Sequence, residues 1–107
     1  MEDLNSMLVH IRMGAILGMY RKGPSIGVYP LKPGVQEADL RAALEAQGYC
    51  TQKPIAEDAA LYGTLDVNAT IISRGEAVVG VLHYWDTDVR VESTEQGVTE
   101  ALEAYIV

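Results

Sequence analysis

The sequence VNATIISRGEAVVGVLHYWDTDVRVE, residues 67–92, carries the clearest secondary-structure signal in the chain. Two runs rich in β-branched residues, 67–73 and 77–85, flank a turn sequence at 73–76, and this arrangement predicts an antiparallel hairpin. If the second run alternates regularly, one face carries Val79, Val81, His83 and Trp85, and the other carries Val78, Gly80, Leu82 and Tyr84. Both faces are mostly apolar, which predicts a central strand covered on both sides.

Further strands are expected on either side of this hairpin. Residues 25–32 read as a strand, and Pro30 places it at an edge of the sheet because proline cannot donate a ladder hydrogen bond. Residues 49–53 and 88–92 are candidates for a further short strand.

Three segments have helical patterns. Residues 3–22 are apolar over much of a helical circumference and end at Gly23-Pro24, so a single packing partner would not cover them. Residues 35–47 are rich in alanine and carry acidic residues in the first turn, which favours a helix. Residues 93–96, Ser-Thr-Glu-Gln, predict a capping box that starts a last helix ending near residue 106.

The order of elements, α-β-α-β-β-β-α, predicts a single α+β domain spanning residues 1–107. We expect a two-layer sandwich in which helices pack on a mainly antiparallel sheet of about four strands. The length of 107 residues is typical of one domain and is sufficient for a hydrophobic core.

Composition narrows the classes of function. The formal net charge of −7 argues against nucleic acid as a partner, since like charges repel. No apolar run is long enough to predict a transmembrane helix, and the acidic start Met1-Glu2-Asp3 does not resemble a secretory signal. The single cysteine, Cys50, rules out an intrachain disulfide, fits a cytoplasmic location and is expected to be buried and inert. No common cofactor motif is found, so no cofactor is predicted.

The charges are unevenly distributed along the chain. Residues 1–35 contain four Lys and Arg against two acidic residues, whereas residues 86–107 contain one Arg against six acidic residues. The acidic last segment raises the possibility of docking on a basic protein partner, or of attraction between two copies of the chain. Solvated surface charge is the simpler interpretation.

The leading hypothesis for function is a non-enzymatic interaction module that self-associates as a dimer or higher oligomer. The first helix offers more apolar surface than one partner can cover. Gly14 and Gly18 form a G-x-x-x-G pair that allows close approach of another backbone; close packing on a sheet or helix of the fold is the simpler interpretation of the pair, and a subunit interface is the alternative. The expected interface residues are Met7, Ile11, Gly14, Gly18 and Tyr20.

A second hypothesis is a domain that binds a small molecule. The chain has six tyrosines and one tryptophan but no phenylalanine, and such amphipathic rings suit the walls of a pocket. An acidic residue there would attract a cationic ligand. The expected ligand-binding residues are Tyr29, Tyr62, His83, Tyr84, Trp85 and Asp86.

A third hypothesis is a small enzyme that uses His83 with Asp86 or Asp88. A neutral histidine can act as a base near pH 7, and paired carboxylates can bind a cation or share a proton. If the strand continues regularly, both aspartates lie on one side and His83 lies on the other, which favours the alternative of a histidine that is merely hydrogen-bonded.

Overall fold

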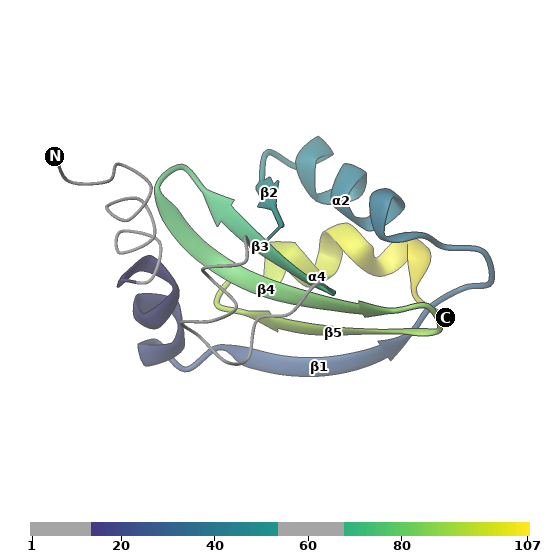
Figure 1. Ribbon diagram of the computed structural model, residues 1–107, viewed down its shortest axis with the longest axis horizontal. Helices are drawn as coiled ribbons and strands as arrows, with labels where there is room; N and C mark the ends of the chain where they lie inside the picture. The colour runs from purple at the N-terminus through teal and green to yellow at the C-terminus, as the bar shows by residue number, and fades with distance from the viewer. Residues whose placement is uncertain (1–13, 54–67) are drawn as a thin grey trace, which may run out of the picture.

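The computed structural model describes residues 14–53 and 68–107 of the chain (Figure 1). A helix covers residues 14–21 of the described part. The remaining elements are β1 (Ser25–Pro30), α2 (Glu37–Ala46), β2 (Cys50–Gln52), β3 (Ala69–Arg74), β4 (Ala77–Trp85), β5 (Asp88–Ser93), α4 (Gln96–Leu102) and the short 3-10 helix η1 (Glu103–Tyr105). The α+β sandwich is confirmed, with five strands instead of about four, because the segments around residues 50 and 90 both pair into the sheet.

The sheet has the order β1-β5-β4-β3-β2, and every neighbouring pair is antiparallel. The strand around Pro30 therefore lies at an edge, as predicted, and the hairpin strand β4 is central. β1 and β2 run in the same direction at opposite edges, so α2 crosses one face of the sheet to connect them (Figure 1). None of the described helices is long and apolar enough to cross a membrane.

Apolar side chains pack on both faces of the sheet. On the face covered by α2 and α4, which we call the α2/α4 face, Leu40 and Leu44 of α2 pack in one cluster with Leu82 of β4. On the opposite face, which we call the reverse face, the helix at residues 14–21 contributes Ile16 and Met19 to a second cluster. The sheet residues of this second cluster are Ala69, Ile71 and Val81. Within the described residues, the helix at residues 14–21 thus contacts the sheet through one of its sides.

A β-bulge interrupts the β3–β4 pairing. Ser73 pairs with Val78 and Ile72 pairs with Gly80, so Val79 is an extra residue in β4. The bulge sends Val79 into the cluster on the α2/α4 face, while Val78 packs against the reverse-face cluster. The prediction that Val79 and Val81 share a face was wrong, because strict alternation fails across an inserted residue.

The helices α2 and α4 have different hydrogen bonds at their N-termini. At α2 the backbone N–H of Gln36 donates to Asp39 Oδ2 at 2.8 Å, which agrees with a stabilising role for acidic residues in this first turn. The capping box predicted at residues 93–96 is absent, since Ser93 ends β5 and the residue preceding α4 is Glu95. Ser93 Oγ instead accepts from the N–H of Glu95 at 3.0 Å, a local bond that competes with capping.

Candidate functional site

The sheet divides the residues that were predicted to bind a ligand. Tyr29 lies opposite Val89 and packs against the cluster on the α2/α4 face, and Tyr84 lies on the same face, where its hydroxyl donates to the carbonyl oxygen of Val35 at 2.9 Å. His83 and Trp85 alternate with Tyr84 and lie on the reverse face. Tyr62 lies outside the described residues. The described members of the set therefore do not share one pocket.

The two aspartates that follow β4 do not alternate along one strand. Asp86 is in the two-residue turn between β4 and β5 and has a φ of 50°, a left-handed conformation that aspartate tolerates. Burial, followed by the charge of Asp86, raises the pKa of Tyr84 above its ordinary value. Asp88 starts β5 opposite Trp85 and so shares the reverse face. The expectation that both aspartates lie on one side was wrong, because β4 ends before Asp86 and the regular alternation of side chains between the two faces does not continue through the turn.

His83 is buried on the reverse face, with 6% of its surface exposed. Its ring stacks on Trp85 with a centroid separation of 5.9 Å and an interplanar angle of 21°. The residues directly opposite His83 are Ala69 on β3 and Arg90 on β5, so its nearest charged cross-strand neighbour is a cation and not an aspartate. In the described part of the chain, no group of three or more His, Cys, Asp or Glu residues is arranged to hold a metal ion.

A buried acid on the reverse face was missed by the sequence analysis. Glu92 of β5 is only 6% exposed, and its Oε1 lies 3.8 Å from Arg90 Nη2. Burial together with the charge and hydrogen bonding of Glu92 raises the pKa of Tyr20 to about 12. Tyr20 thus presents a protonated hydroxyl to a carboxylate. Only the docking of the first helix brings these residues together, so no local spacing in the sequence could indicate the pair.

The predicted interface residues of the first helix have different environments. Gly14 and Gly18 lie on the outer side, and among the described residues no heavy atom would lie within 4 Å of a Cβ at either position. Leu17, also on this side, is 43% exposed. Tyr20 is half-buried against the sheet. Met7 and Ile11 lie outside the described residues. The glycine pair therefore does not serve close packing within the described part of this chain.

The most exposed large apolar side chains within strands belong to β1. Ile26 and Val28 are 60% and 59% exposed, and they lie on the reverse face opposite Glu92 and Arg90. Trp85, two strands away on the same face, is 43% exposed. The sequence indicated the edge position of this strand, but not that its apolar side chains would face solvent.

The backbone N–H and C=O groups of Ile26 and Val28 point outward from the edge of the sheet, away from β5. The N–H of Leu31 donates to the carbonyl oxygen of its partner Thr87 at 2.8 Å, so Leu31 and every second residue before it direct their polar groups toward β5. The residues between them, including Ile26 and Val28, direct theirs outward. In the described residues the outer side of β1 is occupied only beyond Tyr29, where the N–H of Val107 donates to Pro30 O at 3.0 Å and Leu31 bridges Ile106.

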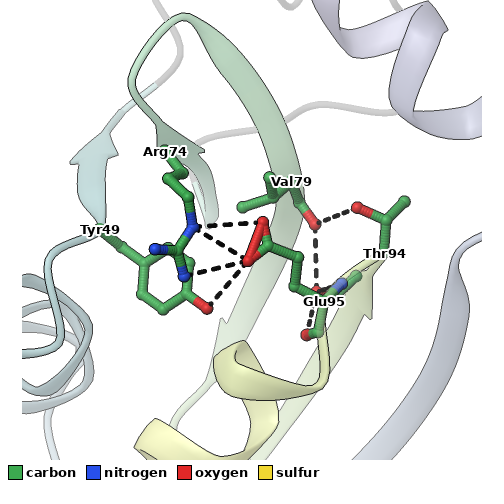
Figure 2. A network of polar contacts seen from close by, with 6 residues as sticks. Tyr49, Arg74, Val79, Thr94 and Glu95 are labelled. Atoms are coloured by element: carbon green, nitrogen blue, oxygen red, sulfur yellow. Dashed lines mark hydrogen bonds and ion pairs between the residues drawn. The ribbon is translucent and has the colours of Figure 1, made fainter.

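A polar cluster joins the β3–β4 hairpin to the start of α4 (Figure 2). The guanidinium of Arg74 contacts the carboxylate of Glu95 through Nε and Nη2, each 3.0 Å from Oε1, and it lies 4.7 Å from the ring centroid of Tyr49. The hydroxyl of Tyr49 donates to the same Oε1 at 3.4 Å. The polar groups of Tyr49, Arg74 and Glu95 are thus paired with one another, and the cluster holds the end of β3 to the residue that precedes α4. A polar hollow of about 310 Å³ lies beside it, lined by Gln47, Tyr49, Arg74, Gly97, Glu100 and Ala101.

Cys50 is exposed, so the expectation of a buried cysteine was wrong. It lies on the outer strand β2 opposite Ser73, where the sheet ends and the reverse-face cluster does not extend over it. Cys50 lines the rim of a cavity of about 280 Å³ whose apolar walls include Ile16, Ile71 and Val78. None of the described residues predicted to bind a ligand lines this cavity.

Comparison with known proteins gives no family for this chain. No protein-family model, no curated protein and no solved structure matches it.

Proposed function

We propose that this protein is a self-associating interaction module, a homodimer in its simplest form, without a catalytic role of its own. The observation that supports the proposal is the outer side of β1. There two residues of the same face, Ile26 and Val28, are 60% and 59% exposed, and their backbone N–H and C=O groups point outward from the sheet.

Single exposed apolar residues are common on protein surfaces, but here two of them lie side by side on an unpaired strand edge. A strand edge with unpaired N–H and C=O groups is a template for pairing with another chain, and proteins ordinarily protect it with charged side chains. β1 has no charged residue between Ser25 and Pro30. The uncharged outer edge of β1 up to Tyr29 is therefore the surface of the described chain best suited to a protein contact.

The catalytic hypothesis has less support from the geometry. His83 lies opposite Arg90, and Asp86 lies in the turn, whereas Asp88 shares the reverse face with His83. Of the two predicted pairings, only His83 with Asp88 therefore has both residues on one face. General acid–base catalysis requires the participating groups to converge within hydrogen-bond reach of a substrate.

The proposal is tested by the molar mass of the full chain in solution, measured by size-exclusion chromatography with light scattering over a range of protein and salt concentrations. We expect twice the chain mass of 11.6 kDa, retained at high salt because apolar and backbone contacts are little screened. A monomer at every concentration up to about 1 mM would refute self-association. A dimer that dissociates at high salt would instead support docking of the acidic last segment on basic residues.

A second candidate function is small-molecule binding, which the cavity beside Cys50 favours. Its volume of about 280 Å³ and its apolar walls are close to those of small ligand sites. The test is the fluorescence of an apolar dye with wild type and with Val78→Phe, a change that would fill the cavity. Dye binding that is equal in both proteins would exclude this cavity as the site.

A further inference from the structure

We propose that two copies of the chain pair through β1, antiparallel and around a two-fold axis at Gly27, so that two five-stranded sheets become one continuous sheet of ten strands. This inference rests on the proposed self-association and specifies its geometry. The partner is a second copy because the edge is complementary to itself in its backbone and its apolar side chains.

The backbone groups of the edge match those of a second, inverted copy. Ile26 and Val28 are the residues between Ser25 and Tyr29 whose N–H and C=O groups point outward. With Gly27 on the axis, Ile26 of one copy faces the partner's Val28, and Val28 faces the partner's Ile26. Residues that face each other with outward-directed groups form the hydrogen-bonded pairs of an antiparallel ladder. All four outward groups of each copy then find a partner.

The sequence of the edge is nearly palindromic about the same glycine. Residues 24–30 read Pro-Ser-Ile-Gly-Val-Tyr-Pro, with a β-branched residue on each side of Gly27 and a proline three positions away in both directions. Prolines end a ladder because they lack the N–H donor. Beyond Tyr29 the outer side is already paired with residues near the C-terminus, through Pro30 and Val107. The part of the outer edge that is free to pair therefore lies between Pro24 and Pro30 and is centred on Gly27, as a two-fold axis requires.

The side chains on the two faces fit this arrangement. On the reverse face, Ile26 and Val28 from both copies form one apolar group of four, which removes from water the most exposed large apolar residues of the described strands. On the α2/α4 face the ring of Tyr29 lies over Gly27, so each copy brings an amphipathic ring next to the axis. Tyrosine is favoured in interfaces for its large apolar area and its hydroxyl.

The ends of the edge carry charges of both signs. Arg21 and Lys22 precede β1, and the far end of β1 lies beside Asp88 and the turn that contains Asp86, but Lys32 also follows β1 there. With Gly27 on the axis, Lys22 of one copy comes to the position of the partner's Lys32, so the match between the two copies lies in the backbone and the apolar side chains and not in the charges.

Two substitutions on β1 and one control separate this geometry from other modes of association. Ile26→Lys places a cation opposite Glu92, which suits the monomer, but it puts charge into the apolar group of four. Val28→Pro removes an outward N–H that has no role within the described sheet and keeps an apolar side chain. Leu17→Lys is the matched control, an equivalent change at an exposed apolar residue of the first helix.

We expect each β1 variant to raise the dissociation constant of the dimer at least about 100-fold, because every substitution occurs twice in a two-fold interface. Leu17→Lys should keep the wild-type constant within about threefold. Circular dichroism of each variant confirms folding. Amide hydrogen exchange by NMR reports the register, since Ile26 and Val28 N–H groups should be protected in the wild-type dimer, and Val28 N–H should exchange rapidly in monomeric Ile26→Lys.

The outcomes distinguish the two proposals. A wild-type chain that stays monomeric overturns both self-association and the pairing through β1. A dimer that tolerates both β1 variants, or whose Ile26 and Val28 amides exchange freely, overturns the pairing and leaves self-association standing. Dissociation by Leu17→Lys alone would assign the interface to the first helix.

Discussion

The ring of Tyr29 covers the backbone of Gly27, so that a Cβ at position 27 would lie 2.6 Å from Tyr29 Cζ and 2.7 Å from Cε2. We expect Gly27→Ala to lower the free energy of unfolding by about 1 kcal/mol, because the ring must swing away from its packed position. Urea denaturation measures the change. In a Tyr29→Ala background the same substitution should be neutral or stabilising, since alanine restricts the unfolded chain. An equal loss in both backgrounds would show that the ring is not the cause.

A second glycine, Gly80, is required for a different reason. A Cβ there would lie 2.9 Å from the main-chain oxygen of Glu92, and a backbone atom within the β4–β5 ladder cannot move aside as a ring can. We expect Gly80→Ala to cost about 2–3 kcal/mol of the free energy of unfolding, more than Gly27→Ala, by the same denaturation measurement. A cost below that of Gly27→Ala would contradict the argument.

Gly18 provides the opposite case. It lies within the helix at residues 14–21, and no heavy atom of the described residues would contact a Cβ there. Gly18→Ala should therefore raise the free energy of unfolding by about 0.5–1 kcal/mol through helix propensity. If β1 is the interface, the dissociation constant of the dimer should not change. A more stable chain with weaker association would indicate that the outer side of this helix takes part in the interface.

The pairing of Tyr20 with Glu92 predicts a dependence of stability on alkaline pH. The pKa of Tyr20 is raised to about 12 in the folded chain, and its ordinary value of 10.0 applies after unfolding. Below pH 10 both states are protonated and the contribution is fully present. Between pH 10 and 12 the unfolded chain releases the proton first, so the contribution is progressively lost. We expect a loss of about 1–2 kcal/mol after allowing for solvent screening of a half-buried hydroxyl.

The measurement is the free energy of unfolding of wild type minus that of Tyr20→Phe, determined at several pH values. Phenylalanine keeps the ring that packs beside the reverse-face cluster and removes the titrating group. The difference should be constant below pH 10 and should fall above it. A difference that does not vary with pH would mean that the Tyr20 hydroxyl has the same environment in both states.

The sequence was sufficient for the class of fold because its periodic signals are local. The alanine-rich pattern around Leu40 and Leu44 places one side of α2 in the core, and the β-branched runs around residues 71 and 81 form the predicted hairpin. Proline chemistry placed β1 at an edge, since Pro30 has no N–H to donate. Each of these signals depends on residues only a few positions apart.

The site could be predicted less well because its features depend on non-local events. The bulge at Val79 exchanges the faces of neighbouring residues, and the turn at Asp86 restarts alternation, so counting positions assigned several side chains incorrectly. The contact between Tyr20 and Glu92 requires the first helix to dock on β5 from a distant part of the chain. The exposure of Cys50 depends on where the reverse-face cluster ends.

The two edges of the sheet are unequal in length, and this limits how large an assembly can become. β1 has six residues, whereas β2 at the other edge has only three. A sheet with two long open edges can add copies at both, which is the geometry of fibres. If two copies pair through β1, as proposed, that edge is no longer open, and the three residues of β2 offer a much shorter template. Growth by strand addition would then end at two copies.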